Sequence, residues 1–159
     1  MKKTIRVLCI SCILLIFSFN SCSVKKKTQN DTIMYCIHKN FKSVDFNKQC
    51  LVFIIGEQGC INCNRELSNL AKQFVDNDGV YYIINATGNL VDISPYWEAK
   101  GQERISMDTL QYLNKNNLKY SYAVFISENK IDTVLEAKAE TLLLDKEYIK
   151  QKILNTKTK

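Results

Sequence analysis

An unbroken apolar run, a short turn and an amphipathic pattern follow one another within residues 51–74. The run at residues 51–55 is rich in β-branched side chains, which predicts a buried strand. After a glycine-containing turn, apolar side chains recur at the spacing of one helical face: Leu67, Leu70, Ala71 and Phe74. We assign the polar residues of this stretch to the other helical faces: Arg65, Glu66, Ser68, Asn69, Lys72 and Gln73. The pattern therefore predicts strand, tight turn and helix.

Further strand patterns extend this unit into a sheet. Residues 80–84 are strongly β-prone and follow a turn signal, so they should complete a strand–helix–strand unit with parallel strands. Residues 120–127 predict another strand, and residues 131–137 should pair back with it as a hairpin across a turn at residues 128–130. The chain is thus expected to be α/β with a mixed sheet.

The remaining segments carry weaker signals. Residues 32–38 can form a first strand, whereas residues 40–49 fit either a short helix or a wide turn. Ser106 is expected to cap a helix whose first turn contains Asp108. Asp145 is expected to cap the last helix. The inward side chains of these two helices should be Met107, Leu110 and Leu113 for the first, and Tyr148, Ile149 and Ile153 for the last.

A long irregular segment at residues 85–105 contains the only proline and the only tryptophan, in the sequence Pro95-Tyr96-Trp97. Long loops inside compact domains are often functional. The strand that precedes this loop, at residues 80–84, should be parallel to the strand before Cys60. The loop should therefore leave the sheet at the same edge as the cysteines. Tyr96 and Trp97 are therefore candidates for a partner-binding lip. An equally good interpretation is that Trp97 anchors the loop to the core.

The turn before the central helix contains the motif Cys60-x-x-Cys63. Cys60 should lie at the helix N-terminus, where free backbone N–H groups and the helix dipole favour a thiolate. Cys63 lies one turn further along and four residues before Leu67, so it should be on the buried side. This difference in exposure predicts that Cys60 attacks and Cys63 resolves the resulting mixed disulfide.

This strand, turn, Cys-x-x-Cys and helix resemble the thioredoxin-like proteins, in particular the membrane-tethered thiol-disulfide oxidoreductases of bacterial envelopes. The resemblance covers about residues 33–154 and implies a three-layer sandwich with a mixed central sheet and flanking helices. The chain departs from the family in several places. Gly59 replaces the tryptophan that many members have, the pair between the cysteines is Ile61-Asn62, and residues 51–55 contain no acid.

The resemblance also implies which residues contact a substrate. Family members have a cis-proline before the strand that follows this site, and its loop pairs with the substrate backbone. Here Ser121-Tyr122 stands at that place without proline, and we expect a trans peptide. Tyr122 would then partly cover Cys60 or contact the partner. The candidate site comprises Cys60 and Cys63 as catalytic residues, with Gly59, Ser121, Tyr122 and Trp97 in supporting or substrate-binding roles.

The N-terminal pattern is that of a signal peptide. Lys2, Lys3 and Arg6 precede an apolar stretch at residues 7–19 that is short for a transmembrane helix. Ser21-Cys22 at its end resembles a lipoprotein processing site, with an ordinary cleaved signal or an uncleaved anchor as alternatives.

We therefore expect a signal peptide at 1–21, a polar tether at 22–31 and one thioredoxin-like domain at 32–159. The lipid on Cys22 would anchor the protein to a membrane of the bacterial envelope, with its domain in the periplasm.

Charge gives little support for other classes of partner. Removing the three basic residues of the signal peptide lowers Lys+Arg from 22 to 19 against 16 acidic residues, so the net charge falls from +6 to +3. No basic stripe with interleaved aromatics indicates nucleic-acid binding. Protein disulfides or dithiols are the expected substrates, with a membrane redox partner and no cofactor.

Two other function classes remain open. The protein could be a non-catalytic accessory lipoprotein whose disulfide is structural, or a Cu(I) or Zn(II) carrier. Two thiolates leave a zinc site incomplete, so His38 or Cys36 would have to join it, and we assign no metal ligand. Cys36 and Cys50 could form a second disulfide, or could remain as a thiol and a buried small side chain. His38, the only histidine, is expected to be an exposed residue at a strand end.

Overall fold

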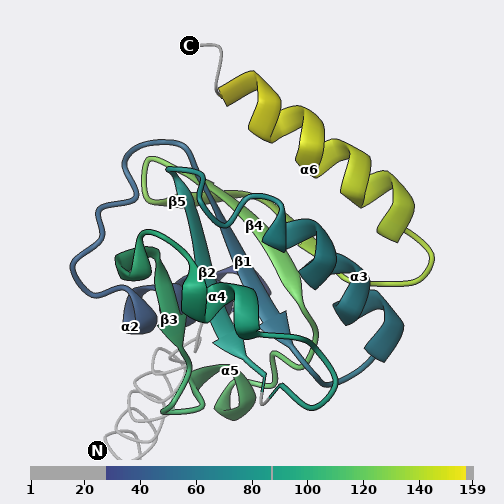
Figure 1. Cartoon of the computed structure of the whole chain (residues 1–159). Coiled ribbons are helices and arrows are strands. Elements are labelled where there is room, and N and C mark those ends of the chain that lie inside the picture. The colour runs from purple at the N-terminus through teal and green to yellow at the C-terminus, as the bar shows by residue number, and fades with distance from the viewer. Residues whose placement is uncertain (1–27, 87, 157–159) are drawn as a thin grey trace, which may run out of the picture.

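The computed structural model describes residues 28–86 and 88–156, which contain one five-stranded mixed sheet of order β3-β2-β1-β4-β5 (Figure 1). The first three strands of that order are parallel, whereas β4 and β5 run antiparallel to their neighbours. The strands are β1 Cys50–Gly56, β2 Val80–Asn85, β3 Ile105–Met107, β4 Tyr122–Ser127 and β5 Lys130–Glu136. The helices are α2 Gln29–Asn40, α3 Ile61–Lys72, α4 Ser94–Glu98, the 3₁₀ turn η1 Gln102–Arg104, α5 Tyr112–Lys115 and α6 Leu142–Thr156.

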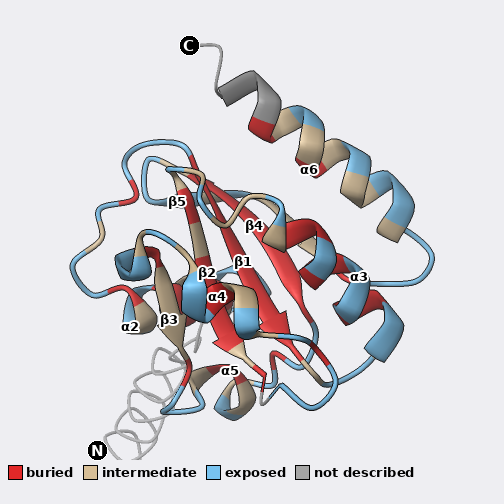
Figure 2. Ribbon diagram, in the orientation of Figure 1, coloured by how far each residue is buried: buried red, intermediate tan, exposed pale blue. Residues whose placement is uncertain are grey.

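The central strand β1 is buried at every position (Figure 2). Its side chains are divided between two cores. Leu51, Phe53 and Ile55 face the core beneath α3 and α6, because alternate side chains of a strand point to opposite faces. Val52 and Ile54 face the core beneath α2 and α5. The result is an α/β fold in three layers that resembles the thioredoxin fold, as the sequence predicted.

The strand–helix–strand unit around the cysteines is also confirmed. β1 and β2 pair in parallel, and α3 between them begins at Ile61 and buries Leu67, Leu70 and Ala71 as expected. The hairpin of β4 and β5 turns through Glu128 and Asn129, both with positive φ, which is the geometry of tight hairpin turns.

The predicted first strand at residues 32–38 is wrong, because this segment belongs to helix α2. Thr28 and Asp31 form a capping box in which each side chain accepts from the other residue's backbone N–H. Ile33, Cys36 and Ile37 are buried at helical spacing, so one face of α2 packs on the sheet. The helix begins at Gln29, inside the range predicted as a tether, and the signal peptide and Cys22 lie outside the described residues.

Two helix starts also differ from expectation. Ser106 lies in strand β3 rather than at a cap, since Ile105–Met107 pairs with β2. Asp108 does serve a helix start, because its carboxylate accepts from the backbone N–H groups of Tyr112 and Leu113 at 2.9 and 2.8 Å. The last helix begins at Leu142, so Asp145 lies in its first turn.

Leu110, expected on an inward helical face, is exposed before α5. In α6, Ile149 and Ile153 are buried as predicted.

Candidate functional site: a disulfide at the start of helix α3

Cys60 lies directly after the turn that leaves the carboxyl end of β1 and caps helix α3. Its backbone is extended, and its sulfur accepts the backbone N–H of Cys63 at 3.3 Å. The first turn of α3 contains no acidic residue, so no carboxylate within it opposes the positive end of the helix dipole. The sequence placed this sulfur at a helix N-terminus, and the structure confirms that position.

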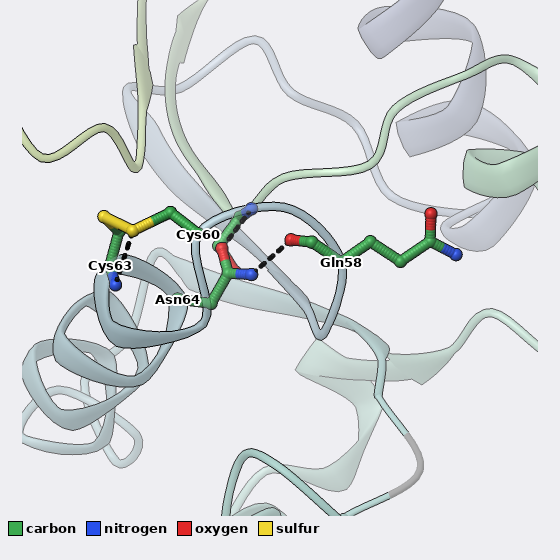
Figure 3. Close-up of a disulfide and its surroundings, with 5 residues drawn as sticks. Gln58, Cys60, Cys63 and Asn64 are labelled. Carbon is green, nitrogen blue, oxygen red and sulfur yellow. Dashed lines mark hydrogen bonds between the residues drawn. A yellow bond between two sulfur atoms is a disulfide. The ribbon is translucent and has the colours of Figure 1, made fainter.

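Cys60 and Cys63 are joined by a disulfide, with their Cα atoms 5.2 Å apart (Figure 3). Cys63 is 2% exposed and packs in the core beneath α3, whereas Cys60 is half-buried. Ile61 and Asn62 between them are both exposed. Of the two sulfurs, that of Cys60 is therefore the more accessible to a molecule approaching from solvent, as the sequence predicted.

Asn64 fixes the turn that carries Cys60, although sequence reasoning did not single it out. Its side chain is fully buried. Its Nδ2 donates to the carbonyl of Gln58 (Figure 3). Its Oδ1 accepts the backbone N–H of Ser121 at 3.0 Å. One carboxamide thus joins the segment before Cys60 to the loop before β4.

The signal for Asn64 was present in the helical spacing. Asn64, Leu67, Ser68 and Ala71 stand at i, i+3, i+4 and i+7, and all four are buried. The sequence analysis assigned Ser68 to a polar face of α3, whereas the structure places it on the buried face. Its hydroxyl lies 3.2 Å from the hydroxyl of Tyr96, so it is buried with a hydrogen-bond partner.

Ser121, a predicted substrate-binding residue, has both of its backbone polar groups engaged within the protein. Its N–H donates to Asn64, and its carbonyl accepts the N–H of Ala137 at 2.9 Å. Its hydroxyl oxygen accepts the N–H of Gly56 at 2.9 Å. The described residues contain no cis peptide bond, in line with the trans peptide expected at Ser121-Tyr122. Ser121 therefore joins the loop before β4 to the end of β1.

Gly59 packs against an aromatic ring that the sequence analysis did not assign to the site. Gly59 has a φ of 77°, and a Cβ built on it would overlap ring carbons of Tyr120. Tyr120 is 37% exposed and directly precedes Ser121. Its ring therefore covers the turn beside Cys60. Because this contact joins positions far apart in the chain, no local pattern indicated it.

Tyr122 does not lie where the sequence analysis expected it. It is 2% exposed and packs in the core beneath α2, whereas Cys63 belongs to the core on the opposite face of the sheet. Burial raises the pKa of Tyr122 to about 12. The alternation of side chains along β4 explains this placement, and Tyr122 is not the residue that covers the Cys60 turn.

Tyr96 was expected at a partner-binding lip and Trp97 either there or as an anchor to the core, and the structure corrects both the lip position of Tyr96 and the anchor role of Trp97. Tyr96 is the anchor, since it is 2% exposed and its ring lies 5.3 Å from that of Tyr82. Trp97 is 60% exposed, so it is available to a partner, although the structure does not bring it into contact with the disulfide.

Glu57 connects the loops that follow the two parallel strands. Its Oε1 accepts backbone N–H groups of Gly88, Leu90 and Val91 at 3.0, 3.1 and 3.3 Å. The loop after β2 therefore leaves the sheet at the same edge as the cysteines, as predicted, and is held to the turn after β1.

The other candidate ligands and thiols lie on the opposite side of the sheet. Cys36 and Cys50 are buried thiols in the core beneath α2, not a second disulfide. Burial raises the pKa of Cys50 to about 12, with Asp132 adding to the effect. His38 is exposed, as expected, but on α2 and with its ring edge-on to Phe46.

Within the described residues, no group of three or more His, Cys, Asp or Glu side chains is arranged to hold a metal ion. That part of the chain also contains no helix long and apolar enough to cross a membrane.

No protein-family model, curated protein or solved structure matches the chain. The functional assignment therefore rests on the geometry of the site. A Cys-x-x-Cys disulfide at the start of a helix, directly after the central strand of a thioredoxin-like fold, is an arrangement suited to thiol-disulfide exchange.

Proposed function

We propose that the protein is a membrane-tethered thiol-disulfide oxidoreductase that exchanges disulfides with proteins of the bacterial cell envelope. The observation that carries this proposal is the Cys60–Cys63 disulfide at the N-terminus of α3, with one half-buried cysteine and one buried cysteine. A purely structural disulfide has no need of this position, whereas a reactive thiolate is stabilised by it.

The exchange uses the two sulfurs in sequence. In the reduced protein, the Cys60 thiolate attacks one sulfur of a substrate disulfide, and the other substrate sulfur leaves as a thiolate. Cys63 then attacks the Cys60 sulfur of the mixed disulfide, forming the Cys60–Cys63 bond and releasing the second substrate thiolate. The substrate gains two electrons and the protein loses two. The reverse sequence oxidises a substrate dithiol.

The cellular setting of this proposal comes from the N-terminal sequence. A lipid on Cys22 would attach the chain to a membrane and leave the domain in the periplasm, where a membrane redox partner would restore its redox state. Envelope compartments sustain disulfides in their proteins, so both substrate disulfides and dithiols occur there.

One observation favours a second candidate, a non-catalytic accessory protein on the same fold. The N–H and carbonyl of Ser121 are both engaged within the protein, so Ser121 does not offer the backbone pairing that the family resemblance implied for this loop. In this second candidate, the disulfide would serve only to hold the start of α3. The two candidates differ in whether the disulfide opens reversibly.

A redox titration separates the two candidates. The full-length chain, with Cys9, Cys12 and Cys22 changed to Ser and kept in a non-ionic detergent, is termed the reference chain. It is equilibrated across glutathione ratios, and free thiols are trapped and counted by mass. We expect a reversible two-electron transition that is lost in Cys60→Ser and in Cys63→Ser.

The matched control is Cys50→Ala, which removes a buried thiol from the opposite face of the sheet and should leave the midpoint unchanged. A pair that opens only in denaturant would refute the oxidoreductase and support the accessory protein.

A further inference from the structure

Asn64 makes three hydrogen bonds to the two segments that surround Cys60. Its backbone N–H donates to the Cys60 carbonyl at 2.9 Å. Its side chain donates to the carbonyl of Gln58 (Figure 3) and accepts the N–H of Ser121. Because the carboxamide is fully buried, water does not compete for these bonds. Asn64 therefore fixes the turn on both sides of Gly59.

The disulfide depends on the position of this turn. Cys63 is held by the body of α3 and by the core, whereas Cys60 is carried by the short segment between Gly56 and the first turn of the helix. Gly59 in that segment adopts a positive φ and is itself flexible in the absence of constraints. The bonds from Asn64 keep Cys60 next to Cys63.

We infer that Asn64 is a positioning residue for ring closure, holding the Cys60 sulfur where Cys63 can attack it. This inference rests on the proposed function and assigns Asn64 to its second step. In that step the Cys63 thiolate attacks the Cys60 sulfur of the mixed disulfide. The Cys60–Cys63 bond forms, and the bond from Cys60 to the substrate breaks. The substrate sulfur leaves with the electron pair and takes a proton from water.

The first step of the exchange does not require the Cys60 sulfur to lie next to Cys63. The Cys60 thiolate attacks a disulfide that arrives from solvent, so an incoming substrate can follow a turn that has moved. Ring closure joins two sulfurs of the same chain, and misplacement of either lowers the rate. Loss of the Asn64 carboxamide should therefore slow ring closure more than it slows the initial attack.

Ser68 provides a matched control on the same helix. It is as fully buried as Asn64 and also makes a side-chain hydrogen bond, but its partner is Tyr96 on α4 rather than the Cys60 turn. Ser68→Ala should therefore destabilise the chain without moving Cys60. A general loss of stability affects both variants, whereas a loss of positioning affects only Asn64→Ala.

The experiment follows the mixed disulfide with glutathione. The reduced reference chain is mixed with oxidised glutathione, samples are quenched in acid, and the glutathione adduct on Cys60 is measured by mass. The same measurement on chains that also carry Cys63→Ser gives the rate of attack alone. We expect the adduct to persist roughly tenfold longer in Asn64→Ala than in the reference chain, and its lifetime in Ser68→Ala to be unchanged.

Three results would overturn the inference. The first is an adduct lifetime that is the same in Asn64→Ala and Ser68→Ala. The second is that attack and ring closure slow by the same factor in Asn64→Ala. If the chain that carries Cys63→Ser forms no adduct on Cys60, the proposed function fails and the inference fails with it, so the two failures are distinguishable. Should Asn64→Ala not fold, as judged by circular dichroism, Asn64→Ser is measured instead, because its hydroxyl is too short to bridge both partners.

Discussion

The contact between Gly59 and Tyr120 predicts a large penalty for adding a single methyl group. The substitution is Gly59→Ala, at a φ of 77°. A left-handed backbone costs an alanine about 1–2 kcal/mol relative to glycine. The new Cβ would also overlap the Tyr120 ring, which must then move off the turn. We assign about 1 kcal/mol to that displacement, the low end of the overpacking range, since the ring is partly exposed.

A comparison with Gly79 separates the backbone cost from the cost of displacing the Tyr120 ring. It has nearly the same φ, 76°, and the nearest atom to a Cβ there is the Gln49 carbonyl oxygen at 3.8 Å, an ordinary contact. Gly79→Ala should therefore cost only the backbone part, about 1–2 kcal/mol, whereas Gly59→Ala should cost about 2–3 kcal/mol. In a Tyr120→Ala background the overlap disappears, so the cost of Gly59→Ala should fall by about 1 kcal/mol.

Urea unfolding of the oxidised reference chain, of the three single variants Gly59→Ala, Gly79→Ala and Tyr120→Ala, and of the double mutant Gly59→Ala with Tyr120→Ala measures these costs. Two results would refute the reasoning. The first is a Gly59→Ala penalty no larger than that of Gly79→Ala. The second is a Gly59→Ala penalty that stays the same when Tyr120 is replaced, which would show that the ring does not press on the turn in solution.

Three further predictions concern other parts of the molecule. Burial raises the pKa of Cys50 to about 12, so at pH 8 iodoacetamide should leave Cys50 unmodified in the folded chain and label it after urea is added, as peptide mass mapping would show. Hydrogen bonds from Ser94 and Lys72 lower the pKa of Asp92 to about 2 from an ordinary 3.8, so its contribution to stability is complete above about pH 4 and is lost as the pH falls through 2. The difference in melting temperature between the reference chain and Asp92→Asn should shrink over that interval; a constant difference would contradict this. Arg104→Leu should lower the free energy of unfolding by about 3 kcal/mol, because the guanidinium donates to four backbone carbonyls, and a loss below 1 kcal/mol in urea titration would show that water replaces it.

The sequence predicted the elements whose signal is local. The strands at residues 51–55 and 80–84 followed from β-branched and β-prone runs, and the face of α3 followed from helical spacing. Helix α2 was missed because Thr32 and Ile33 are β-branched, although the capping box of Thr28 and Asp31 was present in the sequence.

Strand β3 was missed for a different reason. Three residues are too few to show a period, and Ile105–Met107 becomes a strand only because β2 lies beside it.

The features of the site also fall into those that local spacing predicts and those that depend on contacts between distant parts of the chain. The exposure of Cys60 and the burial of Cys63 followed from their positions on a helix. The roles of Asn64 and Tyr120 depend on partners about sixty residues away in the chain, which no local pattern reveals. Tyr122 was misplaced because a shift of one residue along a strand moves a side chain to the other face of the sheet.

The hydrogen-bonded backbone of Ser121 also has a consequence for how the site can change in evolution. A site that pairs with the backbone of its partner accepts many sequences, because every peptide has the same main chain. Here the main chain at Ser121 is already bonded within the protein, so in the proposed oxidoreductase discrimination between partners would fall to exposed side chains around Cys60, such as Ile61 and Asn62. These side chains can be exchanged without breaking the hydrogen bonds that build the turn. Under the proposed function, the choice of partner would therefore change in evolution while the disulfide and its geometry are preserved.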